Sequence, residues 1–207
     1  MWKHLSLSVL LLAVGFAAGQ DMPLHEIIKP GEDWKPHSGI MPRPASFYSV
    51  DASNRQILLN RGTSNSREPL KNLLKEPTCC AVSLGGSTLL VADATDRYVW
   101  AFRIEKGGSL GPGDRYCRLR VRGDERRKKD TPADAYKADA SAMAVDGARR
   151  TYVATSLGIQ VFDPTGRLCG VIMAPPGRVT ELAFQGNRLY AQSGDKVFAR
   201  TMLAEGK

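Results

Sequence analysis

The stretch LLVADATDRYVWAFRI, residues 89–104, decides the fold. An apolar run ends at Asp93, the polar turn Ala94–Asp96 follows, and Arg97–Ile104 forms a second, largely apolar run. Short runs of β-branched and aromatic residues separated by polar turns are typical of antiparallel strands. The stretch therefore predicts a strand, a tight turn and a second strand.

The same pattern recurs along the chain. It is found again over residues 47–60, 151–163 and 189–201. A further short apolar run precedes three of the four units, at residues 81–83, 143–146 and 182–184. Tyr152 and Tyr190, at matching places in two units, are separated by about 40 residues, the length of one propeller blade. The repeat predicts an all-β propeller, with a β-sandwich as the alternative.

The composition is that of a globular protein. The chain has 207 residues, of which 43% are hydrophobic and 24% charged, and this excludes wholesale disorder and a fibrous repeat. Twenty glycines and twelve prolines favour a turn-rich chain over a helix bundle. The net charge of +8 permits contact with polyanions, and three histidines leave little room for an all-histidine metal site.

The first nineteen residues have the features of a secretory signal peptide. Lys3 gives a basic start, Leu5–Phe16 is nearly all apolar, and the small residues of Ala17–Gly19 suit cleavage before Gln20. The alternative is an uncleaved N-terminal anchor. We expect a secreted or periplasmic protein without a membrane span after cleavage, because no later segment is apolar for long enough.

These observations divide the chain into three parts. We expect a signal peptide at 1–19, an N-terminal arm at 20–45, and propeller blades at 46–207 with a basic insertion at 113–140.

Export would place the cysteines in an oxidising compartment. Cys79, Cys80, Cys117 and Cys169 could form two disulfides there, in any of three pairings. Buried free thiols are the other interpretation. No Cys-x-x-Cys spacing is present, so a zinc knuckle or a thioredoxin-type site is not expected.

The repeats resemble the gluconolactonase / regucalcin / luciferin-regenerating enzyme family. Residues 89–110, 151–166 (TYVATSLGIQVFDPTG) and 194–198 look like blades of that family, and 22–34 (MPLHEIIKPGEDW) resembles the start of its bacterial secreted members. The resemblance covers most of the chain after the signal and implies a six-bladed β-propeller. Six blades of about 40 to 45 residues exceed this chain, so we expect an incomplete propeller of about four blade-like units.

An incomplete propeller leaves sheet faces and edges exposed. Three outcomes are therefore expected as alternatives: a four-bladed closure, an open arc that forms a homodimer through its open blade edges, and a truncated product.

The resemblance also implies a divalent cation, calcium or zinc, held on the propeller axis by a Glu, an Asn and an Asp. Thr78 stands at the Asn position, Ser141 stands at the Asp position, and residues 39–44 offer no Glu. No metal ligand is therefore intact, and a hydroxyl is a poorer ligand for such an ion than a carboxylate. Asp139 and Glu181 are the residues that could restore the site.

The repeat register places Thr78, Ser141 and Thr180 at matching starts of the inner strands, so we expect these three hydroxyls to line the axis. No Gly-x-Ser-x-Gly elbow or phosphate-binding loop occurs in the sequence. No catalytic residue is therefore assigned.

One segment is strongly basic. Arg118–Lys129 (RLRVRGDERRKK) holds seven basic and two acidic residues, and Arg118, Arg120 and Arg122 alternate onto one face. The segment predicts either a contact with a polyanion or a solvated edge that blocks strand aggregation. Nucleic acid is not favoured, because no aromatic residues are interleaved.

Two functions follow from the sequence. The first is metal-assisted hydrolysis of a sugar lactone or related ester, which the resemblance implies. The alternative is a catalytically inactive propeller that binds a ligand or a protein, which the replaced metal ligands favour.

Overall fold

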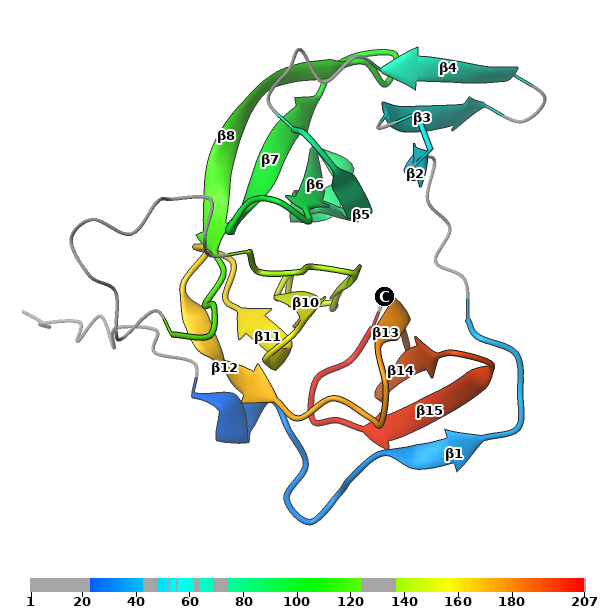
Figure 1. The fold of residues 1–207 in the computed structure, drawn as a ribbon, viewed down its shortest axis with the longest axis vertical. Helices are drawn as coiled ribbons and strands as arrows, with labels where there is room; N and C mark the ends of the chain where they lie inside the picture. The colour runs from blue at the N-terminus through cyan, green and yellow to red at the C-terminus, as the bar shows by residue number, and fades with distance from the viewer. Residues whose placement is uncertain are drawn as a thin grey trace, which may run out of the picture.

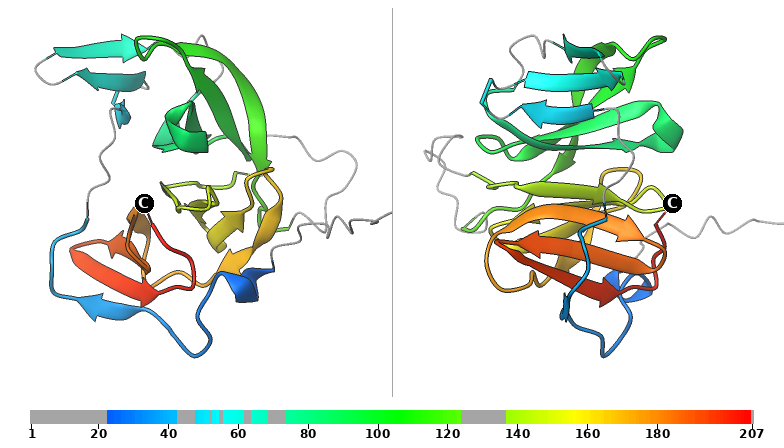
Figure 2. Two further views of the ribbon diagram at one scale, coloured as in Figure 1. Left: turned by 180° about the vertical axis from the view of Figure 1, so that it is seen from behind. Right: turned by 90° about the vertical axis from the view of Figure 1, so that its right-hand side faces the viewer.

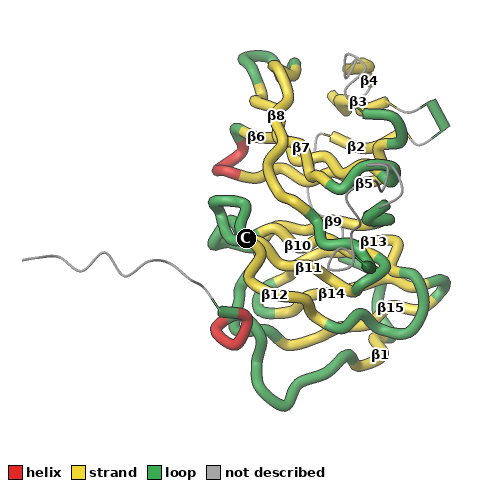
Figure 3. Tube along the Cα trace, turned by 60° about the vertical axis from the view of Figure 1, so that its left-hand side comes forward, coloured by secondary structure: helices red, strands yellow, loops and turns green. Residues whose placement is uncertain are grey.

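The computed structural model describes residues 23–42, 48–51, 53–54, 56–61, 64–68, 74–123 and 137–206. The predicted signal peptide and residues 124–136 of the predicted basic insertion lie outside these ranges. Strands make up most of the described chain, and the two short helical turns, η1 (Leu24–Glu26) and η2 (Leu84–Gly86), are 3-10 turns (Figure 3). The all-β prediction is confirmed.

The strands form four antiparallel sheets, which are the blades of an incomplete propeller. The first blade consists of β2 (Tyr48–Asp51), β3 (Gln56–Arg61) and β4 (Ser64–Glu68). The second consists of β5 (Pro77–Ser83), β6 (Thr88–Asp93), β7 (Tyr98–Ile104) and β8 (Leu110–Arg118). The third consists of β9 (Ala142–Val145), β10 (Thr151–Thr155), β11 (Gly158–Phe162) and β12 (Leu168–Ile172). The fourth consists of β13 (Val179–Gln185), β14 (Arg188–Ser193), β15 (Lys196–Thr201) and β1 (Lys35–His37).

The blades follow one another around an open arc (Figures 1 and 2). Their inner strands β2, β5, β9 and β13 are neighbours in that order. The first and fourth blades lie at the two ends of the arc, so the expected incomplete propeller of about four units is confirmed.

The predicted hairpin at residues 89–104 forms β6 and β7 at the centre of the second blade. Residues 89–92 of β6 are buried on both faces of the sheet. Leu89 and Val91 pack in the apolar cluster shared with the first blade, whereas Leu90 and Ala92 pack in the cluster shared with the third. Because side chains alternate between the two faces of a strand, one strand contributes to both interfaces.

Residues from the N-terminal region complete the last blade. β1 pairs with β15, with Lys35 opposite Ala199, and Ile28 forms an isolated antiparallel bridge with Met202. The backbone N–H of Leu203 also donates to the carbonyl of Ile27 at 3.0 Å. Part of the predicted N-terminal arm is therefore the outer strand of the fourth blade.

The free face of the fourth blade is covered by the chain itself. Met41 is only 7% exposed and packs with Ala183 and Tyr190 on the side of the blade that faces away from the third blade. The ring of His37 also lies edge-on to that of Tyr190, with centroids 5.2 Å apart. An end of the arc that would otherwise expose apolar surface is thereby closed.

The first blade ends the arc with polar groups. Tyr48, Ile57 and Leu59 pack against the second blade. Ser49 and Asn60 alternate with these residues along β2 and β3 and share their face with the half-buried Leu58, and the Asn60 amide donates to the Ser49 hydroxyl at 3.2 Å. A face of this kind is compatible with water.

All four cysteines are free thiols, so the structure favours the free-thiol interpretation over a disulfide. Burial raises the pKa of Cys79 and of Cys80 to about 12, which keeps both thiols protonated at neutral pH. None of the helices in the described part of the chain has the length and apolarity needed to span a bilayer.

Asp93 organises the turn that follows β6. Its carboxylate accepts hydrogen bonds from the backbone N–H groups of Lys75, Glu76 and Thr95 at 2.6, 2.8 and 2.7 Å. Burial raises the pKa of Asp93, but these hydrogen bonds and that of the Thr95 hydroxyl outweigh burial and hold the pKa below its ordinary value. The ionised form therefore stabilises the fold.

We predict that Met41→Ala lowers the free energy of unfolding by about 2 kcal/mol, because it removes the apolar cover of the fourth blade. Ile40→Ala is the matched control, since Ile40 is 90% exposed and its loss should change stability by less than about 0.5 kcal/mol. Urea denaturation measures both values. Equal stability of the two variants would contradict the covering role.

We also predict a pH-dependent effect of Asp93→Asn. Because the folded-state pKa of Asp93 is lowered, its stabilising contribution is present above about pH 4 and is lost as the pH falls through the folded-state value. The variant should be less stable than the natural chain at pH 7, and the difference should shrink at pH 2 to 3. Urea midpoints across this range test the prediction, and a constant difference would contradict it.

Candidate functional site

The three predicted axis residues occupy matching places on the inner strands. Thr78 lies at the start of β5, Ser141 lies immediately before β9, and Thr180 is the second residue of β13. The hydroxyls of Thr78 and Ser141 each form a hydrogen bond to the next blade. That the three hydroxyls line the axis stays a prediction.

Two of these hydroxyls join neighbouring blades. The Thr78 hydroxyl donates to the carbonyl of Ala140 at 2.7 Å, and the Ser141 hydroxyl donates to the carbonyl of Val179 at 2.7 Å. Each bond runs from the inner strand of one blade to the backbone at the inner strand of the next. We call this pair the hydroxyl latches.

Thr180 has no such partner in a following blade among the described residues. Its hydroxyl approaches the Gln192 carbonyl of its own blade at 3.4 Å, and the residue is exposed. The difference follows from topology, because the fourth blade is the last of the arc.

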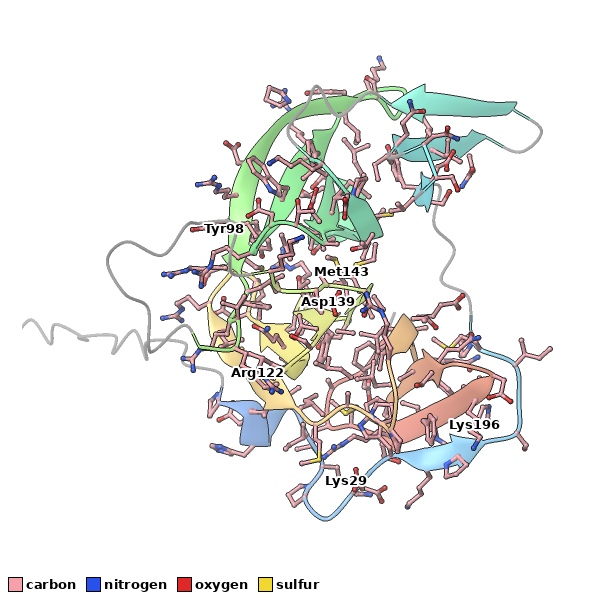
Figure 4. The ribbon with its side chains drawn as sticks, viewed as in Figure 1. Lys29, Tyr98, Arg122, Asp139, Met143 and Lys196 are labelled. Carbon is pink, nitrogen blue, oxygen red and sulfur yellow. The ribbon has the colours of Figure 1, made fainter. Side chains whose placement is uncertain are left out.

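Asp139 lies close to Ser141, in the segment before β9 (Figure 4). Its backbone has φ 53°, a left-handed conformation that aspartate tolerates better than most residues. Its carboxylate accepts a hydrogen bond from the Arg178 guanidinium at 2.8 Å, and this contact is also an ion pair. Glu181 is exposed and does not line the pocket that Asp139 and Arg178 share.

That pocket has a volume of about 320 Å³ and lies between the third and fourth blades. We call it the Asp139–Arg178 pocket. Its polar lining comes from the segments before β9 and β13 and from the turn between β10 and β11. The polar lining residues are Asp139, Ser141, Thr155, Ser156 and Arg178. A pocket of this volume is at the lower end of the range that takes small molecules.

The β10–β11 turn forms a fixed wall of the pocket. The Thr155 hydroxyl donates to the Gly158 carbonyl at 2.9 Å and accepts from the Gln160 amide at 3.1 Å. Gly158 has φ 116°, and a Cβ there would lie 2.6 Å from the Ile172 carbonyl oxygen, so only glycine fits. The wall is therefore held before any ligand binds.

The residues of this region do not fit a divalent cation. The hydroxyls of Thr78 and Ser141 carry no negative charge and are poor ligands for a hard cation, and the Arg178 guanidinium places a positive charge beside the Asp139 carboxylate. No cluster of three or more His, Cys, Asp or Glu side chains suited to a metal occurs within the described ranges. Asp139 is paired with Arg178, and Glu181 does not line the pocket, so restoration of a metal site by either residue stays a prediction.

Sequence reasoning missed the other polar residues of the pocket. Thr155 and Ser156 belong to a turn whose composition suits any hairpin, and Arg178 follows a Pro-Pro-Gly stretch far along the chain. No local pattern distinguishes them from ordinary turn residues, because the pocket exists only where two blades meet.

No family model matches the chain, and neither does any curated protein. Solved structures do match. A gluconolactonase from Xanthomonas campestris has a TM-score of 0.53 at 20% identity, over 81% of this chain and 49% of its own. The calcium-binding protein regucalcin from Agrobacterium tumefaciens has a TM-score of 0.55 at 14% identity, over 73% of this chain and 54% of its own.

This chain has the gluconolactonase-type propeller fold. A luciferin-regenerating enzyme matches as well, with a TM-score of 0.54 at 16% identity, over 73% of this chain and 53% of its own. The resemblance found in the repeats is thus confirmed at the level of the fold. The chain spans about half the length of these gluconolactonase-type propellers.

We predict that Thr78→Val and Ser141→Ala each lower the free energy of unfolding by about 1 kcal/mol, since each leaves a carbonyl without its latch. Thr180→Val should cost less than about 0.5 kcal/mol, because its hydroxyl is exposed and makes only a long contact.

Urea denaturation with and without 1 mM calcium chloride measures these effects. The same differences should appear in both series. Calcium that stabilised the natural chain but not the two latch variants would show that the hydroxyls act as metal ligands instead.

Proposed function

We propose that this gluconolactonase-type propeller is a ligand-binding module that works without a metal. It binds a small polyhydroxylated molecule, a sugar lactone or related ester, in the Asp139–Arg178 pocket. The observation that carries the proposal is the half-exposed ion pair of Arg178 and Asp139, at 2.8 Å, in the lining of a pocket of about 320 Å³.

The pocket chemistry supports this ligand class. The Arg178 guanidinium supplies donors for a lactone or ester carbonyl, and the Asp139 carboxylate accepts from sugar hydroxyls. Ser156 is exposed in the wall and adds a further hydroxyl. A carboxylate, a guanidinium and several hydroxyls around one small space match the alternating donors and acceptors of a sugar.

The same arrangement argues against hydrolysis. Hydrolysis of a lactone needs a base or a metal ion to activate water. No histidine lines the described pocket, and its carboxylate is held by Arg178. Metal-assisted lactone hydrolysis is the second candidate, favoured by the fold shared with a solved gluconolactonase.

Export and association complete the proposal. The signal-like residues 1–19 support a protein that works outside the cytoplasm, secreted or periplasmic. The homodimer through open blade edges stays a prediction. The cover that Met41 forms over the fourth blade favours a monomer, and sedimentation velocity at several concentrations tests this point.

The proposal predicts that D-glucono-1,5-lactone or a related aldonate ester stabilises the natural chain saturably in a thermal-shift titration after treatment with EDTA. Arg178→Gln and Asp139→Asn should each weaken this binding at least fivefold, because each removes one half of the charged pair. Arg188→Gln is the matched control, an exposed arginine of the same blade outside the pocket.

A calorimetric titration with calcium, zinc and manganese chlorides, followed by a lactone-hydrolysis assay, separates the two candidates. The binding module predicts no saturable metal binding and no metal-dependent turnover. Saturable metal binding with turnover that EDTA abolishes would replace it with the hydrolase.

A further inference from the structure

A second hollow, of about 800 Å³, lies where the chain leaves β8 and passes the third blade. We call it the arginine groove. One side is formed by residues 118–123, and the other by Leu168 and Val171 of the outer strand β12 and by Leu157. Arg122, labelled in Figure 4, belongs to the first of these sides. The described lining contains three arginines and no acidic side chain.

The arginines share one face because of the core beneath them. Leu119 and Val121 are buried in the cluster between the second and third blades. Arg118, Arg120 and Arg122 alternate with these residues and are exposed. Burial therefore alternates from residue 118 to residue 122, and the three arginines lie together on the exposed side of this segment.

The backbone beneath these arginines is held by a buried side chain of the third blade. The Gln160 amide, which is 0% exposed, accepts from the N–H of Arg120 at 2.8 Å and donates to its carbonyl at 2.8 Å. The N–H of Leu119 also donates to the carbonyl of Arg97 at 2.8 Å. The backbone that carries the arginines is therefore held in place before a ligand arrives, which lowers the backbone entropy lost on binding.

We propose that the arginine groove binds an acidic oligosaccharide, a chain of uronate sugars. Guanidinium groups pair with carboxylates in two parallel hydrogen bonds, so three arginines on one exposed side suit a chain with a carboxylate on each sugar. Leu157, Leu168 and Val171 supply an apolar wall for the C–H faces of the sugar rings.

Other polyanions fit the groove less well. Nucleic acid strands bind through aromatic side chains that stack on bases, and no aromatic residue is present in the described lining. An acidic peptide that adds as a strand needs free backbone groups, and Gln160 already occupies both groups of Arg120. An oligosaccharide needs neither stacking nor backbone pairing.

The groove and the Asp139–Arg178 pocket are adjacent at the β10–β11 turn, because Leu157 lines both. The inference goes beyond the proposed function and does not depend on it, since no other residue is shared between the two linings. Failure of ligand binding in the pocket would leave the groove proposal unchanged, and the reverse also holds.

The test is a calorimetric titration of the full chain with tetragalacturonate at 150 mM salt. Its methyl ester, which has the same rings without the charges, is the ligand control. The first variant combines Arg118→Gln, Arg120→Gln and Arg122→Gln, and a second carries only the changes at 120 and 122. The matched control combines Lys106→Gln, Arg188→Gln and Lys196→Gln, which removes the same charge from exposed sites outside the groove.

We expect tetragalacturonate to bind the natural chain, the methyl ester to bind at least tenfold more weakly, and both groove variants to lose at least tenfold in affinity. The control variant should stay within twofold. Equal losses in the groove and control variants would reduce the effect to net charge and overturn the proposal. Tighter binding of single-stranded DNA than of tetragalacturonate, lost in the same groove variants, would overturn it in favour of nucleic acid.

Discussion

Burial of each blade on both faces is the constraint on which the rest of the structure depends. In β6, Leu89 and Val91 pack toward one neighbouring blade and Leu90 and Ala92 toward the other. A blade of this kind is stable only between two partners, so an arc has a weak point at each end. The two ends of the arc meet this constraint in different ways. Met41 covers the fourth blade, whereas the first blade presents the polar pair of Ser49 and Asn60.

The hydroxyl latches link this constraint to the site. A hydroxyl at the start of an inner strand is too weak a ligand to hold a hard cation by itself, but it reaches a carbonyl of the adjacent blade. Thr78 and Ser141 use this geometry to join three successive blades. The charged groups then lie to one side, where Asp139 and Arg178 neutralise each other. A ligand bound there would meet hydrogen-bond donors and acceptors whose charges balance. A metal site would instead present a concentrated positive charge.

The turn between β10 and β11 contributes to two hollows of different character. One is a small, charge-balanced pocket, and the other is a larger groove whose charged lining residues are all basic. Gln160 serves both, because its amide bonds Thr155 on the pocket wall and Arg120 beneath the groove. One buried side chain thus holds the geometry of both surfaces.

The sequence by itself determined the strands, the repeat and the class of fold, because period-two alternation and turn composition are local properties. The hairpin at 89–104 and the shared exposed side of Arg118, Arg120 and Arg122 could be predicted for that reason. The resemblance also identified Thr78 and Ser141 as residues that stand at two metal-ligand positions of the family. Only the tertiary structure decided that their hydroxyls join blades, that Arg178 meets Asp139 across 39 residues, and that Met41 covers the last blade. Those contacts form only where separate blades come together. The spacing of residues along the chain does not indicate which blade faces lack a partner.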